Sequence, residues 1–306
     1  MRAAFYEAFG GPEQLKVGDL PQPEGDGTHL VIRAEAAGLG FWDVKQLQGL
    51  FGTKMRMPVI AGYEAAGVVE YAPEGAPFMR GDRVFATPPF PGGACAEFVR
   101  ARVDHAAPAP TSVDAADAAA LVVSATTAYE GIVDRSDVAQ NTTVLVTAAS
   151  GSVGLNAVQI AVARNARVFA VAGPSSHELL RSYGVAGVYD YHDPGWADAV
   201  RVDSAGVDVI FDAAGGDTAA AALTTAKTEA TLLTVIADQA PPTFGRPFEF
   251  FSAEATDTRL TAVAELVDSG RLRPMVATRV PLVEIAQGFA RIAGRHPGGK
   301  VVVSID

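Results

Sequence analysis

Cysteine and clustered positive charge are the two features that this sequence most clearly lacks. Its single cysteine, Cys95, permits no internal disulfide and no cysteine-rich zinc site, and we expect a small, partly buried side chain there. Lys and Arg number 24 against 35 Asp and Glu, and the formal net charge is -11. No stretch gathers enough Lys or Arg to neutralise a run of phosphates, so we expect neither a nucleic-acid partner nor an anionic membrane.

The sequence also lacks long apolar runs. The longest, such as residues 115–123, fall short of the roughly 20 residues that a membrane-spanning helix needs. The N-terminal residues lack the apolar core and cleavage site of a signal peptide, so we predict a cytoplasmic protein. With 306 residues, 49% of them hydrophobic, the chain can build a large core and has a length typical of about two domains.

The pattern of predicted secondary structure changes near residue 112. Before it, short β-rich runs alternate with Gly and Pro, which predicts an antiparallel, barrel-like domain. After it, strands alternate with Ala-rich helical segments, which is typical of βαβ units around a parallel sheet. We predict the strands of that sheet near residues 143–147, 167–171, 187–189, 208–211 and 231–236.

The last third of the chain returns to β character. Residues 246–270 predict one more strand and then a helix that ends at Gly270. The apolar face of that helix would consist of Leu260, Val263, Ala264 and Val267. A helix at 285–293 and a strand at 300–305 follow, and the simplest packing places this tail on the first domain.

The stretch VTAASGSVGLNAVQIA, residues 146–161, runs from a predicted strand into a predicted helix. Ala149, Gly151 and Gly154 have the spacing of the dinucleotide-binding pattern G-x-G-x-x-G, with the first glycine replaced. In such a unit the glycines let the backbone approach a pyrophosphate, which binds amide groups at the positive end of the helix. The candidate cofactor contacts of this turn are Ser150, Gly151, Ser152, Val153 and Gly154.

The end of the next strand offers Gly173, Ser175 and Ser176 and no Asp or Glu. A carboxylate there would bind a free ribose 2′-hydroxyl and repel a 2′-phosphate, so its absence favours NADP over NAD. The nearby cationic candidates are His177 and Arg181, so phosphate recognition would depend mostly on hydroxyl and amide groups. A cap for the following helix is an equally open role for Ser175.

Six segments carry a resemblance to a known family: FGGPEQLKV, AAGLGFWDVKQLQGLFG, GYEAAGVVE, GDRVFA, AASGSVGLNAVQIA and the closing LVDSGRLRPMVATRVPLVEIAQGFARIAGRHPGGKVVV. In their order and spacing, over essentially the whole length, the sequence resembles the medium-chain dehydrogenase/reductase superfamily, specifically its zinc-free quinone oxidoreductase-like branch. The resemblance implies an α/β protein with a GroES-like β-barrel catalytic domain, residues 1–112 and 271–306. It also implies a doubly wound, parallel-sheet Rossmann domain, residues 113–270, with NADPH and a small substrate in the cleft, and a homodimer.

The resemblance also implies cofactor contacts at matching positions. Ser152, Val153 and Gly154 would form the pyrophosphate turn, and Ser175 and Ser176 would face the 2′-phosphate. The remaining contacts would be Tyr191 beside the adenosine, Thr127 and the loop after Ile236 near the nicotinamide, and Lys300 in the GK that opens the last strand. Ordinary packing is the alternative role for Tyr191 and Thr127.

A catalytic zinc ion needs about three Cys, His or carboxylate ligands around an open position. Where zinc-dependent relatives carry Cys, His and a second Cys, this sequence resembles them with Gly40, Tyr63 and approximately Val123. None of these is a good zinc ligand. We therefore expect no metal, and we expect hydrogen bonds or the nicotinamide ribose hydroxyls to polarise a substrate carbonyl.

Two positions depart from the family pattern. Quinone oxidoreductase-like members usually have Asn at Gly40, and related enoyl reductases have a Tyr, a proposed proton donor, at Phe51. Hydride addition to a conjugated alkene needs a group that stabilises the enolate and a proton source. Tyr63 is the leading candidate for a polar catalytic residue, with water or another group as alternatives.

Three further residues lie beside these positions. Asp43 has either a structural hydrogen-bonding role, which we favour, or an acid/base role. Trp42 and Phe51, with Phe41, would form an aromatic wall for a flat or conjugated substrate, or else part of the domain core.

The segment 237–259 is short for the superfamily and predicts an abbreviated edge strand, with Phe248, Phe250 and Phe251 in the core or at a dimer interface. The leading function is an NADPH-dependent, zinc-independent oxidoreductase that reduces a quinone, enone or other activated double bond. The alternative is a protein that keeps the nucleotide site without hydride transfer, as a cyclase, a lyase or a nucleotide-sensing protein would.

Overall fold

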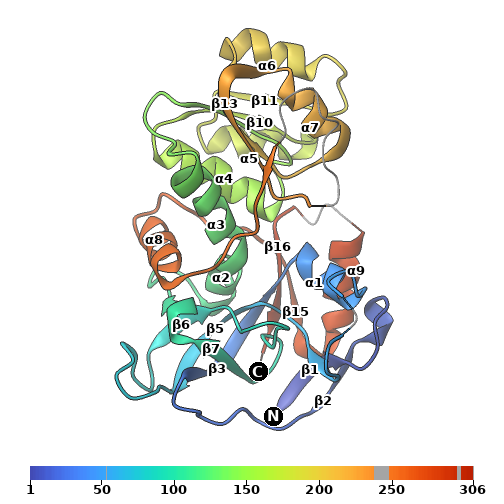
Figure 1. Ribbon diagram of the computed structural model, residues 1–306, viewed down its shortest axis with the longest axis vertical. Helices are drawn as coiled ribbons and strands as arrows, with labels where there is room; N and C mark the ends of the chain where they lie inside the picture. Colours follow the sequence, from blue (N-terminus) through green and yellow to red (C-terminus); the bar gives the residue numbers. More distant parts are fainter. Residues whose placement is uncertain (53, 238–247, 295–297, 306) are drawn as a thin grey trace. The chain divides into compact units, whose positions relative to one another are not determined.

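The structure is a computed structural model that describes residues 1–52, 54–237, 248–294 and 298–305. The chain divides into two compact units. Unit 1 comprises Met1–Thr126, Ala255–Gly270 and Pro274–Asp306, and unit 2 comprises Thr127–Glu254 and Arg271–Arg273. Figure 1 shows the ribbon of both units and labels many of their helices and strands.

Unit 2 is built on a parallel sheet with the strand order β11-β10-β9-β12-β13-β14. Its strands are β9 (Thr143–Val146), β10 (Arg167–Val171), β11 (Gly187–Tyr189), β12 (Val207–Asp212), β13 (Ala226–Thr234) and β14 (Glu249–Phe250). All neighbouring pairs are parallel. Every residue of β9 is buried, as expected for a central strand that is covered on both faces. The predicted parallel sheet is confirmed.

Alternate residues of these strands face opposite sides of the sheet. Leu145, Phe169 and Ile210 pack in one apolar cluster with residues of α6 and α7. Phe211, on the other face, lies against Gly131 of a π-helical turn. The helical elements of this unit are α4 (Ser152–Ala163), α5 (His177–Ser182), α6 (Trp196–Ser204), α7 (Gly216–Leu223), the π-helical turn (Glu130–Arg135) and the 3-10 turn η4 (Pro174–Ser176).

Unit 1 contains two β-sheets that are mainly antiparallel. The smaller has the order β2-β1-β4, and the larger has the order β15-β16-β3-β5-β6-β8, with β7 also paired to β3. The strands of the smaller sheet are β1 (Arg2–Tyr6), β2 (Lys16–Asp19) and β4 (Val59–Ile60). Those of the larger are β3 (His29–Leu39), β5 (Glu64–Tyr71), β6 (Arg83–Ala86), β7 (Phe98–Arg102), β8 (Ala106–Pro108), β15 (Val276–Pro281) and β16 (Lys300–Ser304).

The C-terminal tail joins the larger sheet, because β16 pairs antiparallel with β3. This confirms the predicted return of the tail to the first domain. Strand β3 has register shifts against β5, which mark bulges or irregularities and bend a strand. The helical elements of unit 1 are α1 (Phe41–Leu47), α2 (Ala115–Ala119), α8 (Asp257–Asp268), α9 (Ile285–Ala293) and the 3-10 turns η1 (Pro12–Gln14), η2 (Val103–His105) and η5 (Leu282–Glu284); α3 (Val122–Tyr129) crosses from unit 1 into unit 2.

Helix α8 belongs to unit 1, whereas the sequence prediction included it in the Rossmann domain, residues 113–270. One physical reason is the carboxylate at its end, and another is its buried apolar face. Asp268 accepts hydrogen bonds from the amides and hydroxyls of Thr111 and Ser112 at 2.7 to 3.1 Å. These contacts tie the helix to the chain just beyond β8. The predicted buried face is present at Leu260, Val263 and Val267.

Cys95 is completely buried, at 0% exposure, whereas the sequence predicted a partly buried side chain. The edge strand β14 pairs parallel with β13, and Phe248 and Phe251 are buried while Phe250 is 49% exposed. Part of the shortened segment, residues 238–247, lies outside the described residues.

Within the part of the chain that the structure describes, no helix has both the length and the apolar character needed to cross a bilayer.

Candidate functional site

The turn between β9 and α4 has the geometry of a close strand-to-helix connection. Ala148 has φ 45° and accepts a hydrogen bond from the amide of Gly151 at 2.9 Å. A Cβ atom added at Gly154 would lie 2.3 Å from the Ala148 carbonyl oxygen and 2.8 Å from Ala149 Cα. Because both contacts are with backbone, α4 can begin directly against the turn only if residue 154 is glycine.

The predicted pyrophosphate contacts lie together at the start of this helix. Gly151 is its N-terminal cap, and Ser152, Val153 and Gly154 form its first turn. The first amide groups of a helix have no acceptor within the helix, and they carry the positive end of its dipole. No acidic residue lies in the first turn. Ser150, Gly151, Ser152 and Val153 are partly exposed. Together these features suit the binding of an anion.

The end of β10 brings further predicted contacts together. Ser175 is exposed and Ser176 half-buried, and both belong to η4, which is capped by Gly173. A Cβ atom at Gly173 would lie 3.7 Å from the ring of Tyr191, which is 39% exposed. Neither η4 nor α5 has a side-chain cap, so the alternative in which Ser175 caps the following helix is wrong.

The two contacts predicted near the nicotinamide in unit 2 are on separate elements. Ile236 follows β13, is partly buried, and donates its amide to Thr234 Oγ1 at 3.1 Å. Thr127 is 9% exposed within α3. The common role of Thr127 and Ile236 beside the nicotinamide remains a prediction.

In unit 1 the short helix α1 begins at Gly40. Asp43 caps it, because its Oδ2 atom accepts a hydrogen bond from the Gly40 amide at 2.7 Å. This is the structural role that the sequence favoured for Asp43. Its side chain is buried, and that burial raises the pKa of the carboxyl to about 7, with nearby Glu64 adding to the rise and Lys300 opposing it.

Lys300 lies beside this carboxyl group and not on the surface. Its ammonium is paired with Glu64 Oε1, and Glu64 Oε2 accepts a hydrogen bond from the amide of Val123 at 2.9 Å. A Cβ atom at Gly40 would lie 3.5 Å from the Lys300 nitrogen, so glycine leaves a gap beside these charges. The sequence resemblance predicts that Lys300 contacts the cofactor. The structure shows an ion pair that the sequence reasoning missed because Glu64 carried no signal of its own.

Aromatic side chains cluster around the start of α1, which includes Phe41 and Trp42. Trp42 stacks on Phe51 with ring centroids 3.9 Å apart, and it lies edge to face with Tyr63, with ring centroids 6.3 Å apart. Tyr63 in turn lies 6.5 Å from the ring of Phe90. Trp42 is 42% exposed and Phe41 is 45% exposed, so these two are not core residues. The group presents flat apolar surface.

The hydroxyl of Tyr63 points into a buried polar region. Its oxygen is buried without a hydrogen-bond partner among the described residues, and so are Asp43 Oδ1 and Gln46 Oε1. Burial raises the pKa of Tyr63, and the nearby carboxyl of Asp43 adds to the rise. The tyrosine is therefore protonated at neutral pH. The amide nitrogen of Gln46 donates to Tyr6 at 3.1 Å and to the Pro91 carbonyl at 2.6 Å.

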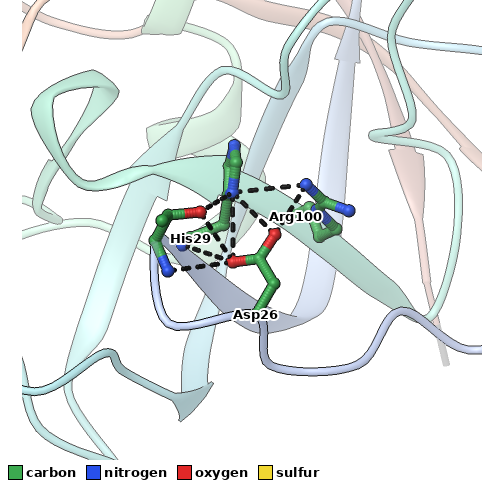
Figure 2. Close-up of polar contacts among 4 residues, drawn as sticks. Asp26, His29 and Arg100 are labelled. Carbon is green, nitrogen blue, oxygen red and sulfur yellow. Dashed lines mark hydrogen bonds and ion pairs between the residues drawn. The ribbon is translucent and has the colours of Figure 1, made fainter.

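A second polar cluster lies on the surface of unit 1 and is shown in Figure 2. Asp26 accepts hydrogen bonds from the amides of Thr28 and His29 at 3.0 and 2.9 Å and pairs with Arg100 at 2.9 Å. The backbone and hydroxyl of Thr28, followed by His29, hold the pKa of Asp26 below its usual range. These bonds satisfy the cluster internally and order the chain before β3.

The comparisons with known proteins cover the chain in two blocks. Residues 26–133 match the family model described as alcohol dehydrogenase GroES-like domain, and residues 183–303 match the model described as zinc-binding dehydrogenase. The human synaptic vesicle membrane protein VAT-1 homolog is 35% identical over 72% of this chain and 57% of its own length. The chloroplastic NADPH-dependent alkenal/one oxidoreductase of Arabidopsis thaliana is 29% identical over 99% of this chain and 79% of its own length. The chain thus spans little more than half of the VAT-1 relatives that it matches.

Solved structures share the complete fold. A probable oxidoreductase from Mycobacterium abscessus has a TM-score of 0.85 at 31% identity, covering 99% of this chain and 98% of that one. An NAD-dependent alcohol dehydrogenase has a TM-score of 0.91 at 27% identity over the full length of both chains. A mycobacterial protein complexed with NADPH has a TM-score of 0.87 at 26% identity over 99% of both.

A GroES-like unit and a Rossmann-like parallel-sheet unit define the class of protein. The chain belongs to the medium-chain dehydrogenase/reductase superfamily, in its quinone oxidoreductase-like branch. The predicted family and fold class are confirmed.

One matching family model is named for zinc, and a zinc ion would need several His, Cys, Asp or Glu side chains grouped together. Among the residues that the structure describes, no three His, Cys, Asp or Glu side chains are grouped to hold a metal ion. Gly40 and Val123, which the sequence resemblance places at or near ligand positions of zinc-dependent relatives, have no donor atom in their side chains, and the carboxylate of Glu64 is paired with the ammonium of Lys300. This donor set does not fit a catalytic zinc ion.

Proposed function

We propose that the chain is an NADPH-dependent, zinc-independent oxidoreductase that reduces a quinone, enone or other activated double bond. The turn from Ala148 to Gly154 is the observation that carries the proposal. Its backbone can approach a pyrophosphate, and its helix offers amide groups without an acidic neighbour. When bound, the nicotinamide supplies the hydride.

The preference for NADPH over NADH is supported by the residues after β10. The segment 172–176 contains no carboxylate, and Ser175 and Ser176 are accessible there. Hydroxyl groups can donate to a 2′-phosphate, which a carboxylate would repel. The names of the Arabidopsis relative and the mycobacterial complex include NADPH, while the alcohol dehydrogenase is named as NAD-dependent.

The substrate class is supported by the aromatic group of unit 1. The stacked pair of Trp42 and Phe51 offers a face to a flat, conjugated molecule. Hydride addition leaves a negative charge that must be stabilised and a carbon or oxygen that must be protonated. Tyr63 is the proposed donor, because it is protonated at neutral pH and its ring contacts Trp42.

Two further parts of the proposal are its assembly and location. We propose a homodimer, on the family resemblance, and a location in the cytoplasm. Sedimentation at several concentrations tests the dimer, and fractionation of cells that express a tagged chain tests the location.

Fluorescence titration with NADPH and NADH, followed by NADPH oxidation against a panel of quinones and enones, tests the function. We expect binding of NADPH in preference to NADH and turnover with at least one acceptor. Tight binding without turnover on any acceptor would favour the second candidate, a nucleotide-binding member without hydride transfer, which Gly40 and Phe51 support. The absence of NADPH binding would refute both.

A further inference from the structure

Asp212 is a fully buried carboxylate at the carboxyl end of β12, at 0% exposure. Its Oδ1 atom accepts hydrogen bonds from Thr147 Oγ1 at 2.6 Å and from the amides of Ala214 and Gly215, both at 3.1 Å. Its Oδ2 atom accepts from Thr234 Oγ1 at 2.7 Å and from Gly215 at 3.2 Å. The charge is therefore stabilised by neutral donors that come from three different segments.

The two threonine hydroxyls extend this network into the backbone. Thr147 Oγ1 accepts the amide of Ala213 at 3.0 Å, and Thr234 Oγ1 accepts the amide of Ile236 at 3.1 Å. Each hydroxyl thus donates to Asp212 and accepts from a loop, which fixes the direction of its hydrogen. The carboxylate joins the residues that directly follow β9, β12 and β13.

The network lies where the order of strands reverses. From β9 the chain continues outward to β10 and β11 and then returns to β12 on the other side of β9. In doubly wound sheets a dinucleotide binds outside the carboxyl ends of the strands at this switch point. Thr147 directly precedes Ala148, the first residue of the turn, and Asp212 faces it from the neighbouring strand.

We propose that Asp212 is a positioning residue of the dinucleotide site. It holds the loops after β9, β12 and β13 in the arrangement that receives the pyrophosphate and the nicotinamide half of NADPH. This inference rests on the proposed function. Asp212 itself is buried beneath these loops, so it acts through Thr147 and Thr234 and not by touching the cofactor.

Thr234 offers the sharpest test, because it lies two strands from the turn and its hydroxyl donates to Asp212, which in turn accepts from Thr147 beside the turn. Thr234→Val keeps the shape and removes the hydroxyl, whereas Thr234→Ser keeps the hydroxyl. We would titrate the wild type and both variants with NADPH and with 2′,5′-ADP, which carries only the adenosine end. We expect Thr234→Val to weaken NADPH binding about tenfold, as the loss of one hydrogen bond would.

The control ligand separates positioning from general destabilisation. We expect 2′,5′-ADP to lose less affinity than NADPH, since its 2′-phosphate lies toward β10 and it lacks the nicotinamide half, and we expect Thr234→Ser to bind NADPH as the wild type does. Unchanged NADPH affinity in Thr234→Val overturns the inference and leaves the proposed function intact. Equal losses for both ligands also overturn it, because a weakened fold would cause them.

A second pair of variants covers the case of poor folding. Thr147→Val and Thr147→Ser make the same comparison from the other side of Asp212. We expect the same selective loss of NADPH affinity in Thr147→Val, and its absence overturns the inference. A wild-type chain that binds 2′,5′-ADP and not NADPH overturns the positioning role and the proposed function together.

Discussion

The ammonium of Lys300 and the carboxylate of Glu64 form an ion pair across 236 residues of sequence, with side-chain exposures of 4% and 2%. Lys300 opens β16 and Glu64 opens β5, and both strands pair with β3. The pair therefore ties the C-terminal strand to the N-terminal part of unit 1. It also places one positive charge beside the two buried carboxyl groups of Glu64 and Asp43.

Lys300→Met should destabilise the chain by about 3 to 5 kcal/mol, because it leaves Glu64 buried without its partner. Urea unfolding measures the loss. In the double variant Glu64→Gln and Lys300→Met, the amide oxygen can still accept from Val123, and no buried charge is left. The double variant should therefore be more stable than Lys300→Met alone. A single variant within about 1 kcal/mol of the wild type would contradict the buried pair.

Asp43 gives a prediction for the pH dependence of stability. Its pKa is raised from 3.8 to about 7 in the folded chain, so between these values the folded state binds a proton that the unfolded state has lost. The stabilisation is therefore complete below pH 3.8 and is lost as the pH rises to about 7. The loss has a slope of at most about 1.4 kcal/mol per pH unit.

Asp43→Asn removes this contribution and keeps an acceptor for the Gly40 amide. The stability of the wild type relative to Asp43→Asn should fall between pH 4 and pH 7 and stay constant above pH 7. Urea unfolding of both proteins across this range provides the measurement. Glu64, Lys300, Tyr63, Tyr6 and Cys95 surround the carboxyl group and are unchanged in both proteins. A difference that is constant with pH would show that Asp43 has an ordinary pKa.

The sequence predicted the elements whose local patterns are strong. The parallel strands of unit 2 repeat a buried, β-branched pattern, and the helix at 285–293 has a regular apolar face, so their positions followed from periodicity. The placement of α8 did not follow, because its partners Thr111 and Ser112 are far away in sequence. Only the tertiary structure shows that Asp268 meets them.

The candidate site shows the same limit. Gly154 could be singled out because a glycine after a strand is a local signal, and the structure shows the contact with Ala148 that requires it. Lys300 was recognised by its position in the family pattern, but its partner Glu64 could not be predicted from spacing. Asp212 was missed for a related reason, since its partners are 65 and 22 residues away.

Two glycines of the turn should differ in their tolerance of alanine. A Cβ atom at Gly154 meets the Ala148 carbonyl oxygen at 2.3 Å, whereas one at Gly151 meets it at 3.3 Å. Gly154→Ala should cost about 1 to 3 kcal/mol of stability and at least about tenfold in NADPH affinity, because the turn must shift. Gly151→Ala is the matched control and should have smaller effects. Equal NADPH affinity of the two variants would refute the assigned turn.

The hydroxyl groups of Tyr63 and Tyr6 provide a final comparison. Tyr63 has a buried hydroxyl without a hydrogen-bond partner in the described residues, whereas the hydroxyl of Tyr6 accepts from Gln46 at 3.1 Å. Removing an unpaired buried hydroxyl relieves a desolvation cost, and removing a paired one loses a bond. Tyr63→Phe should therefore leave the stability unchanged or raise it, and Tyr6→Phe should lower it by about 1 kcal/mol.

In the activity assay the expected order is reversed, because Tyr63→Phe and not Tyr6→Phe should lose activity. If Tyr63 donates the proton, Tyr63→Phe should lower the rate of NADPH oxidation with an enone by about a hundredfold or more, without loss of stability. Tyr6→Phe should keep the rate of the wild type, because its hydroxyl is held by the buried side chain of Gln46. Thermal unfolding and initial rates on the same preparations make the comparison. A Tyr63→Phe variant with full activity would remove Tyr63 as the donor and leave water as the proton source.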